Sequence, residues 1–361
     1  MRKKVFFQIV DTLSMGGTER MSINISAVFS EKGWESHLIV SRRGGGLEAQ
    51  IPEGVIVHFL NKKAFYDLFA FFRLWRLVQT CGPTLVHAHS TSIYWAVAIK
   101  WLTSKFFLVW HDHFGLSDQL DVYPRREMKF FARWINKLMV VNEKLENHWR
   151  KELSGRERDI LFVGNFPWLN LKTQDKFEIF TFLNLANFRP QKDQLNLIKA
   201  VKILTSQIQK FQVLMVGEWI DTEWIAKVKD EISSHGLEEY IQLIGPSTSV
   251  ESYLAKSHVG ILSSESEGLP VALLEYGLAS LPVICTNVGD CQKVIPSEEF
   301  GWVVSPKNSS QLAGSMLEVL TNYPDAIQRG KRLQKKVENE FGKECFWNAY
   351  QTLISPKIQL V

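Results

Sequence analysis

The chain has 361 residues, of which 45% are hydrophobic and 22% charged, and its formal net charge is +4. This composition is ordinary for a globular protein and excludes a disordered or collagen-like chain, while the length favours two domains. Four cysteines without a Cys-x-x-Cys spacing argue against a disulfide framework or a zinc site and favour a reducing cytoplasm.

The charge is unevenly distributed along the chain. Residues 1–165 carry 23 Lys and Arg against 16 Asp and Glu, a net +7, whereas the remainder carries −3. A basic first half favours an anionic partner there, such as a membrane surface, a phospholipid-linked substrate or nucleic acid. The apolar run at 5–10 is too short for a signal peptide. The stretch 77–99 contains Gly, Pro and His and does not predict a spanning helix.

The first half alternates short apolar runs with helical patterns. Continuous apolar runs indicate parallel strands covered on both faces, and their alternation with helices predicts a doubly wound domain. The predicted strands are 4–10, 36–41, 55–60, 84–88, 106–110, 137–141 and 160–163. The predicted helices are 18–32, 65–79, 91–103, 124–136 and 143–153.

The pattern restarts after a polar stretch that reaches about residue 177, which predicts a second doubly wound domain. Its predicted strands are 179–186, 212–216, 241–244, 259–263, 282–286 and 302–304. Its predicted helices are 193–208, 222–235, 249–256, 270–279 and 308–321, and helical residues from about 324 to 353 finish the chain. Ligands of such sheets bind beyond the carboxyl ends of the strands, so residues that follow strands are the candidates for function.

A glycine pair follows the first predicted strand. Gly16 and Gly17 stand where a helix starts, so backbone amides there could approach a phosphate or an acceptor. Such a pair is more often only a turn, and Glu19 could equally pair locally in the first helical turn. The run is not Gly-x-Gly-x-x-Gly, which counts against a dinucleotide oxidoreductase.

Two cations follow the first strand of the second half. Arg189 and Lys192 lie at a predicted strand–helix turn. A departing nucleoside diphosphate needs such charge compensation as its bond breaks. The alternative is a solvated basic turn.

Two carboxylates flank a Gly-Leu-Pro turn after the strand predicted at 259–263. Gly268, followed by Leu269, lets the backbone pass close to a ligand, and Pro270 suits the first turn of a helix whose N–H groups would face an anion. Glu267 precedes this helix and Glu275 lies one to two turns inside it, which suits a ligand rich in hydroxyls and phosphate, such as a nucleotide sugar. The alternative is a surface pair that caps the helix dipole.

This spacing resembles the E-x7-E signature of retaining glycosyltransferases of the GT-B fold, in particular family 4. Residues 280–289 resemble the family's G-x-P-V-I and T-x-V-G continuation, and 301–306 its G-x-L-V-x-P segment. Residues 189–192 match its R-x-x-K pattern, although Phe188 and Asp193 stand where many members have glycine. The resemblance covers nearly the whole chain and is most specific over 180–306.

The resemblance implies a GT-B fold of class α/β, with two Rossmann-like domains and a cleft between them. We expect an acceptor-binding domain over 1–164 and a nucleotide-sugar-binding domain over 165–341. The C-terminal helix over 342–361 would cross back to the first domain.

The resemblance also assigns roles to residues. Arg189 and Lys192 would clamp the diphosphate, Glu267 would contact the donor sugar, and Glu275 would bind ribose hydroxyls. The remaining donor-site expectations are Gly16, Gly17, Gly217, Gly268 and Leu269.

Histidines follow two strands of the first half. His111 matches a family histidine near the donor sugar, where it would orient the sugar or stabilise charge, and His113 is its rival. The acceptor-side candidates are Glu19, His89 and His113, while His87 is expected to be a core residue. No third ligand beside a His-x-His pair is evident and no Asp-x-Asp occurs, so we expect metal-independent catalysis without a cofactor.

Two basic, aromatic segments, 62–76 and 123–134, are candidate interfacial helices on anionic lipid. A core-facing aromatic stripe with a solvated basic face explains them equally well. Together with the resemblance, they make a membrane-bound acceptor and peripheral contact with the inner face of the cell membrane an expectation.

The sequence therefore predicts a retaining glycosyltransferase of the cytoplasm. It would move a sugar from a nucleotide-diphosphate sugar, with UDP favoured, to a hydroxyl of a glycan or lipid-linked acceptor in bacterial surface polysaccharide synthesis. The alternatives are another GT-B enzyme, such as a sugar-nucleotide epimerase or phosphorylase, and a non-catalytic nucleotide-sugar-binding protein. Nucleic-acid binding has no motif behind it.

Overall fold

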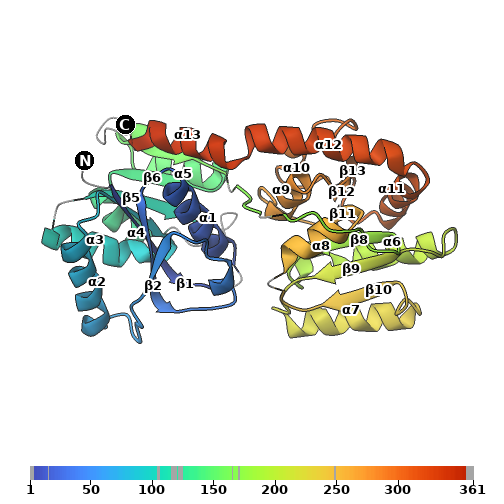
Figure 1. Cartoon of the computed structure of the whole chain (residues 1–361), viewed down its shortest axis with the longest axis horizontal. Helices are drawn as coiled ribbons and strands as arrows, with labels where there is room; N and C mark the ends of the chain where they lie inside the picture. The colour runs from blue at the N-terminus through green and yellow to red at the C-terminus, as the bar shows by residue number, and fades with distance from the viewer. Residues whose placement is uncertain are drawn as a thin grey trace. The chain divides into compact units, whose positions relative to one another are not determined.

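The computed structural model describes residues 4–14, 16–103, 106–114, 120, 125–164, 166–169, 171–247 and 249–354. The chain forms two compact units, of which the first comprises 1–165 with 344–361 and the second 166–343. Each unit contains one parallel sheet with helices (Figure 1), so the predicted α/β class with two doubly wound domains is confirmed. Asn165 at the predicted boundary, 123–124 of the second basic segment and 355–361 of the C-terminal segment lie outside the described residues.

The first unit is built on a seven-stranded sheet in the order β3-β2-β1-β4-β5-β6-β7. Its strands are β1 Val5–Thr12, β2 Glu35–Arg43, β3 Val55–Phe59, β4 Leu85–His89, β5 Phe107–Asp112, β6 Lys137–Val140 and β7 Ile160–Phe162. Its α-helices are α1 Gly17–Glu31, α2 Leu68–Cys81, α3 Ile93–Thr103, α4 Arg126–Phe131, α5 Glu143–Glu152 and α13 Lys343–Ile354. Short 3-10 turns are η1 Glu48–Gln50, η2 Ser90–Ser92, η4 Ala132–Trp134 and η5 Glu157–Asp159.

Aromatic packing fixes α13 on the first unit. The buried side chains of Trp347 and Tyr350 meet the Phe29 ring of α1 edge-on, each with 5.2 Å between centroids. Phe29 in turn stacks on Phe6 of β1 at 3.7 Å. The aromatic residues near the C-terminus are therefore part of the core of the first unit, and Figure 1 shows α13 in red beside the blue α1.

The second unit is built on a six-stranded sheet in the order β10-β9-β8-β11-β12-β13. Its strands are β8 Thr181–Leu185, β9 Gln212–Val216, β10 Ile241–Ile244, β11 Val259–Leu262, β12 Val283–Thr286 and β13 Trp302–Val304. Its helices are η6 Pro190–Lys192, α6 Gln194–Thr205, α7 Thr222–Ser234, α8 Val250–Lys256, α9 Val271–Leu278, α10 Cys291–Val294, α11 Ser309–Thr321 and α12 Tyr323–Glu340.

Both sheets have a point at which the strand order reverses. It lies between β1 and β4 in the first unit and between β8 and β11 in the second. At such a point the loops after the two central strands diverge to opposite faces and leave a crevice at the carboxyl ends. Arg189 and Lys192 lie in the loop after β8, and Glu267 and Gly268 lie in the loop after β11. In the first unit the glycine pair follows β1, and His89 ends β4.

Candidate functional site

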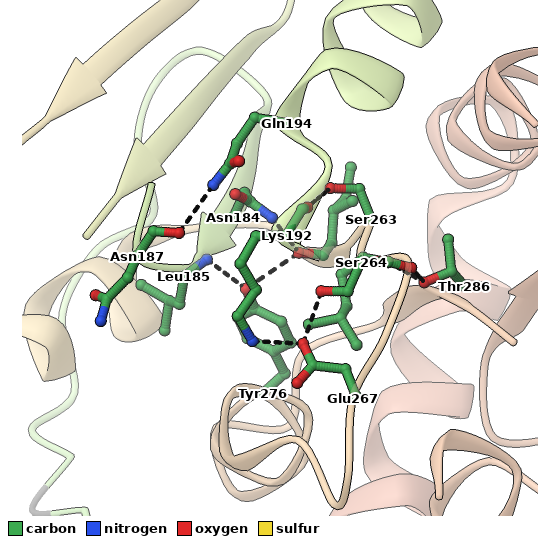
Figure 2. A network of polar contacts seen from close by, with 12 residues as sticks. Asn184, Leu185, Asn187, Lys192, Gln194, Ser263, Ser264, Glu267, Tyr276 and Thr286 are labelled. Carbon is green, nitrogen blue, oxygen red and sulfur yellow. Dashed lines mark hydrogen bonds and ion pairs between the residues drawn. The ribbon is translucent and has the colours of Figure 1, made fainter. Parts of the chain in front are cut away.

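The loops after β8 and β11 bring Lys192 and Glu267 into direct contact. Lys192 Nζ lies 2.6 Å from Glu267 Oε1, and their side chains are only 15% and 9% exposed (Figure 2). The hydroxyl of Ser264 donates to the same carboxylate oxygen at 2.7 Å. Two donors on one oxygen of a mostly buried carboxylate hold Glu267 in one orientation at the carboxyl edge of the sheet.

Further hydrogen bonds fix the backbone of both loops. Ser263 Oγ donates to the carbonyl oxygen of Lys192 at 3.0 Å, and the Glu265 N–H donates to the carbonyl of Gln191 at 2.9 Å. The hydroxyl of Thr286, at the end of β12, donates to the carbonyl of Ser264 at 2.6 Å. Figure 2 shows the contacts of Ser263 with Lys192 and of Thr286 with Ser264, and together these bonds support the Lys192–Glu267 pair.

Tyr276 of α9 joins the two central strands where their ladder stops. The register pairs β8 with β11 at Phe182 and Leu183, which leaves the later backbone groups of these strands unpaired with each other. The Tyr276 hydroxyl accepts the Leu185 N–H at 2.7 Å and donates to the Ile261 carbonyl at 3.2 Å. Burial raises the pKa of this phenol well above its usual value, so it stays a donor.

Arg189 differs from Lys192 in being exposed. Its side chain makes no hydrogen bond or ion pair to any residue that the structure describes, whereas its carbonyl oxygen accepts the Lys192 N–H at 3.0 Å. Asp193, two residues after the Pro190–Gln191 step, has φ +44°, and its carboxylate accepts the Asn196 N–H at 3.2 Å. A left-handed φ at this position explains why many members of the family have glycine here. Aspartate tolerates the left-handed conformation, and its side chain caps the N-terminus of α6.

The carboxylates of the E-x7-E stretch differ in their surroundings. Pro270 is the N-cap of α9 rather than its first residue, and Glu275 lies inside the helix, 8% exposed. Among the described residues, nothing lies within 4 Å of the place where a Cβ on Gly268 would be, so this backbone is open to approach. A Cβ on Gly217, by contrast, would overlap the Ala186 carbonyl, so Gly217 permits close packing of the loops after β8 and β9. Leu269 is partly buried against the core.

The glycine loop of the first unit ends in an uncapped helix. Gly16 is the N-cap of α1, and no side chain caps it among the residues described. Glu19 Oε1 instead accepts hydrogen bonds from Thr12 Oγ1 at 3.1 Å and Ser14 Oγ at 3.4 Å. Gly17 has no described atom within 4 Å of where its Cβ would be. No side chain of the described residues caps the first N–H groups of α1, but the Glu19 carboxylate packs against Gly16, so an anion that binds there would have to displace it.

Four histidines on and just after β4 and β5 form one cluster in the first unit. His87, His89 and His111 are fully buried, and His113 is partly buried. Burial lowers the pKa of all four, that of His113 to about 3, so the rings are neutral near pH 7. His89 contacts His113 through ring nitrogens 2.8 Å apart. A direct contact of His111 with a sugar would require its ring to become accessible.

Asp112, which directly follows His111 in the sequence, holds the end of β5 in place. It is fully buried, forms an ion pair with Arg125, and accepts the Trp149 indole N–H at 2.7 Å. A buried carboxylate with a charged partner and a second donor holds the end of β5 in place. Its role is therefore to support the histidine loop.

Sequence reasoning missed the hydroxyls and the phenol that hold the site. Ser263 and Ser264 directly follow a buried strand, and Thr286 ends the neighbouring one. Polar residues at adjacent carboxyl ends of parallel strands are a usable signal. Tyr276 gives no such signal, because an aromatic residue inside an apolar helix predicts only core packing.

Comparison with known proteins agrees with this geometry. Residues 15–166 match the family described as Glycosyltransferase Family 4, and residues 171–338 match Glycosyl transferases group 1. The chain belongs to the family 4 glycosyltransferases. It is thus a GT-B glycosyltransferase of class EC 2.4, as the resemblance implies.

Relatives match this glycosyltransferase over most of its length. An uncharacterized glycosyltransferase of Haemophilus influenzae is 23% identical over 95% of the chain and 97% of its own length. The amylovoran biosynthesis glycosyltransferase AmsD of Erwinia amylovora is 24% identical over 87% of the chain and 89% of its own. The structure of Anabaena HepE, solved in complex with UDP and glucose, has a TM-score of 0.78 at 15% identity and covers 99% of the chain and 100% of HepE.

The described part of the glycosyltransferase contains no helix with the length and apolarity that a membrane span needs.

Proposed function

We propose that this glycosyltransferase moves a sugar from UDP-sugar to a hydroxyl of a glycan or lipid-linked acceptor, with retention of the anomeric configuration. The observation that carries the proposal is the contact of Lys192 with Glu267 at the strand-order reversal of the second unit. A cation and a carboxylate on adjacent loops match a donor that has a diphosphate at one end and hydroxyls at the other.

The chemistry follows from these charges. When a donor binds, Lys192 leaves Glu267 and forms an ion pair with the diphosphate, and Arg189 is the second cation on that diphosphate. The Glu267 carboxylate is then able to accept a hydrogen bond from a hydroxyl of the sugar. The bond from the anomeric carbon to the diphosphate then breaks, and both cations stabilise the charge that develops on the leaving group. The acceptor oxygen bonds to the anomeric carbon on the same face, and the hydroxyl proton passes to the departing diphosphate.

The first-turn amides after Gly268 and those after Gly16 are further contacts for the donor in this proposal. Glu275 would meet the ribose, and His111 would orient the sugar once its ring is accessible. Glu19, His89 and His113 remain the candidates on the acceptor side. No step uses a metal ion, because the two cations supply the charge compensation.

The identity of donor and pathway rests on relatives. HepE was solved with UDP and glucose, which supports a UDP-sugar donor. AmsD is named for amylovoran biosynthesis, and CapH of Staphylococcus aureus, 25% identical over 79% of the chain, for capsular polysaccharide biosynthesis. These names support the proposal that the enzyme acts in the assembly of a bacterial surface polysaccharide. Four unpaired cysteines support a cytoplasmic location.

Retention can be tested without knowing the acceptor, because water can slowly replace it. With UDP-α-glucose in EDTA, NMR is expected to show α-glucose as the first product released, ahead of mutarotation. Glu267→Gln is expected to slow this hydrolysis at least about 100-fold, since a group that contacts the sugar in the transition state is lost. Glu265→Gln is the matched control, because this neighbouring acid is exposed and pairs with Lys307 instead. Initial release of β-glucose would contradict retention, and dependence on added Mg²⁺ or Mn²⁺ would contradict the metal-independent step.

We also propose that the first unit rests on anionic lipid through an exposed surface at the start of α2. Tyr66, Leu68 and Phe69 are 85%, 78% and 81% exposed, and Phe72 is 57% exposed. The opposite face of α2 is buried, so these aromatic groups are not a core stripe. Lys63, Arg73 and Arg76 are exposed in the same segment, and a basic, aromatic surface complements anionic headgroups.

Vesicle sedimentation tests this surface. The enzyme is expected to sediment with vesicles that contain phosphatidylglycerol and to bind pure phosphatidylcholine much less. Phe69→Ser/Phe72→Ser should weaken binding at least about 10-fold, because each buried aromatic contributes about 1.5–3 kcal/mol. Trp219→Ser/Ile220→Ser, which removes two exposed apolar side chains from the second unit, is the control. Equal sedimentation of all three proteins would refute this surface.

A further inference from the structure

The core of the first unit contains three histidines whose ring nitrogens gather at one point. His87 and His89 are two residues apart on β4, so their side chains lie on the same face of the sheet. His89 is paired in register with His111 on β5. One nitrogen of each ring lies within 4.8 Å of those of the other two, and all three rings are fully buried. Three imidazoles on adjacent parallel strands are thus held together by the sheet itself.

Several polar atoms of this cluster have no partner among the described residues. They are both ring nitrogens of His111, Nε2 of His87 and Oε1 of Gln8. Buried polar atoms nearly always have a hydrogen-bond partner, and unsatisfied ones in a native core indicate an ion or a water at that place. Buried imidazoles are neutral, and a neutral ring offers the lone pair that a metal ion requires.

Neighbouring groups already orient two of the rings. The Tyr350 hydroxyl lies 2.8 Å from Nδ1 of His87, which leaves Nε2 of that ring for the cluster. The Gln8 amide nitrogen lies 2.6 Å from Nε2 of His89 and also donates to the Ser22 carbonyl at 3.2 Å, which fixes the amide orientation. Residues that hold the second nitrogen of a ligating histidine are the usual outer shell of a metal site. His89 also contacts His113, so one of its two hydrogen bonds must break when a metal binds.

We propose that His87, His89 and His111 bind one divalent transition-metal ion, most favourably zinc. Imidazole nitrogens are ligands that zinc prefers, and zinc–nitrogen bonds of about 2.0–2.1 Å in a tetrahedral site imply nitrogen separations of about 3.4 Å. The ring nitrogens, which lie within 4.8 Å of one another, therefore need to approach by up to about 1.4 Å. The ion would link β4 to β5 and, through Tyr350, to α13. The ion would lie in the first unit, whereas the cations and carboxylates of the proposed donor site belong to the second. A His111 ring that binds the ion would not also orient the sugar.

Metal content and binding of the full chain, produced without a polyhistidine tag, test this site. After removal of metal with a chelator, Zn²⁺ or Co²⁺ alone is expected to bind at about one ion per chain, and Co²⁺ should give the intense visible absorption of a tetrahedral site. His87→Ala and His111→Ala should each weaken binding at least about 100-fold. His235→Ala, which removes a histidine of α7, should bind as the wild type does.

A conservative variant guards against misfolding. Tyr350→Phe keeps the aromatic packing of α13 and removes only the hydroxyl that orients His87, so a roughly 10-fold loss of affinity is expected with the fold intact. Failure of the folded wild type to bind either ion would overturn the proposal and leave buried water as the missing partner. Binding that is unchanged in His87→Ala or His111→Ala would overturn it as well. Neither result bears on donor binding by the second unit.

Discussion

Replacing Arg189 and Lys192 together by alanine is expected to weaken UDP binding at least about 100-fold. Each cation contributes about 1.5–3 kcal/mol through charge-assisted hydrogen bonds to the diphosphate, and every 1.4 kcal/mol is a factor of ten in the dissociation constant. The loss has a second source. Without Lys192, the carboxylate of Glu267, only 9% exposed, is left without its cation beside the incoming anion. Isothermal titration of the folded variant with UDP measures the effect.

The control for this variant removes the same charge elsewhere. Lys210→Ala/Lys227→Ala takes two exposed lysines from the second unit, neither of which is in the loops after β8 and β11. If UDP binds through general attraction to a basic surface, both double variants will lose the same affinity. If Arg189 and Lys192 form the diphosphate site, the control binds UDP as the wild type does. Equal affinity of the Arg189/Lys192 variant and the wild type would refute the assigned roles.

The second large effect is expected at Gly289, where one methyl group should damage both stability and donor binding. Gly289 has φ +51°, and a Cβ there would overlap the carbonyl oxygens of Glu267 and Gly268. The next residue, Asp290, donates its N–H to the Gly268 carbonyl at 2.9 Å. This bond holds the loop after β12 against the loop after β11. Gly289→Ala therefore strains its own backbone and pushes Glu267 away from Lys192. The left-handed conformation and the overlap together cost about 2 kcal/mol or more.

Denaturant unfolding and donor hydrolysis measure the two consequences of Gly289→Ala. The free energy of unfolding should fall, and the hydrolysis of UDP-glucose should fall at least about 10-fold because Glu267 is displaced. Gly314→Ala is the matched control: nothing described lies within 4 Å of that Cβ, the position is inside α11, and alanine favours a helix. Its stability should be unchanged or slightly higher. Similar stability and activity of the two variants would show that the contact between these loops is unimportant.

The fold was predictable because its signals are local and repeated. Continuous apolar runs such as 212–216 and 282–286 predict buried parallel strands, and the structure contains them as β9 and β12. The short helix α10 was not predicted, whereas the separate C-terminal helix that the resemblance placed from residue 342 is present as α13, Lys343–Ile354. The four residues of α10 are too few to show a helical period.

The candidate site was predictable only in part. The residues that a ligand would meet follow strands and carry charge, so Arg189, Lys192, Glu267 and Glu275 could be named. What holds them could not, because the bonds of Ser264 to Glu267 and of Tyr276 to two strands depend on how β8 and β11 diverge. The third histidine beside His87 and His89 is His111, and its place depends on the register between β4 and β5, which a single sequence does not contain.

Titration of the wild-type enzyme with UDP, GDP and ADP in the presence of EDTA tests the central claim most directly. The account predicts micromolar binding of UDP, weaker or no binding of GDP and ADP, and no need for a metal ion. Absence of binding by folded protein to all three nucleotides would contradict the assignment of the second unit as a nucleotide-sugar site. It would favour a GT-B protein that has kept the fold and lost its donor.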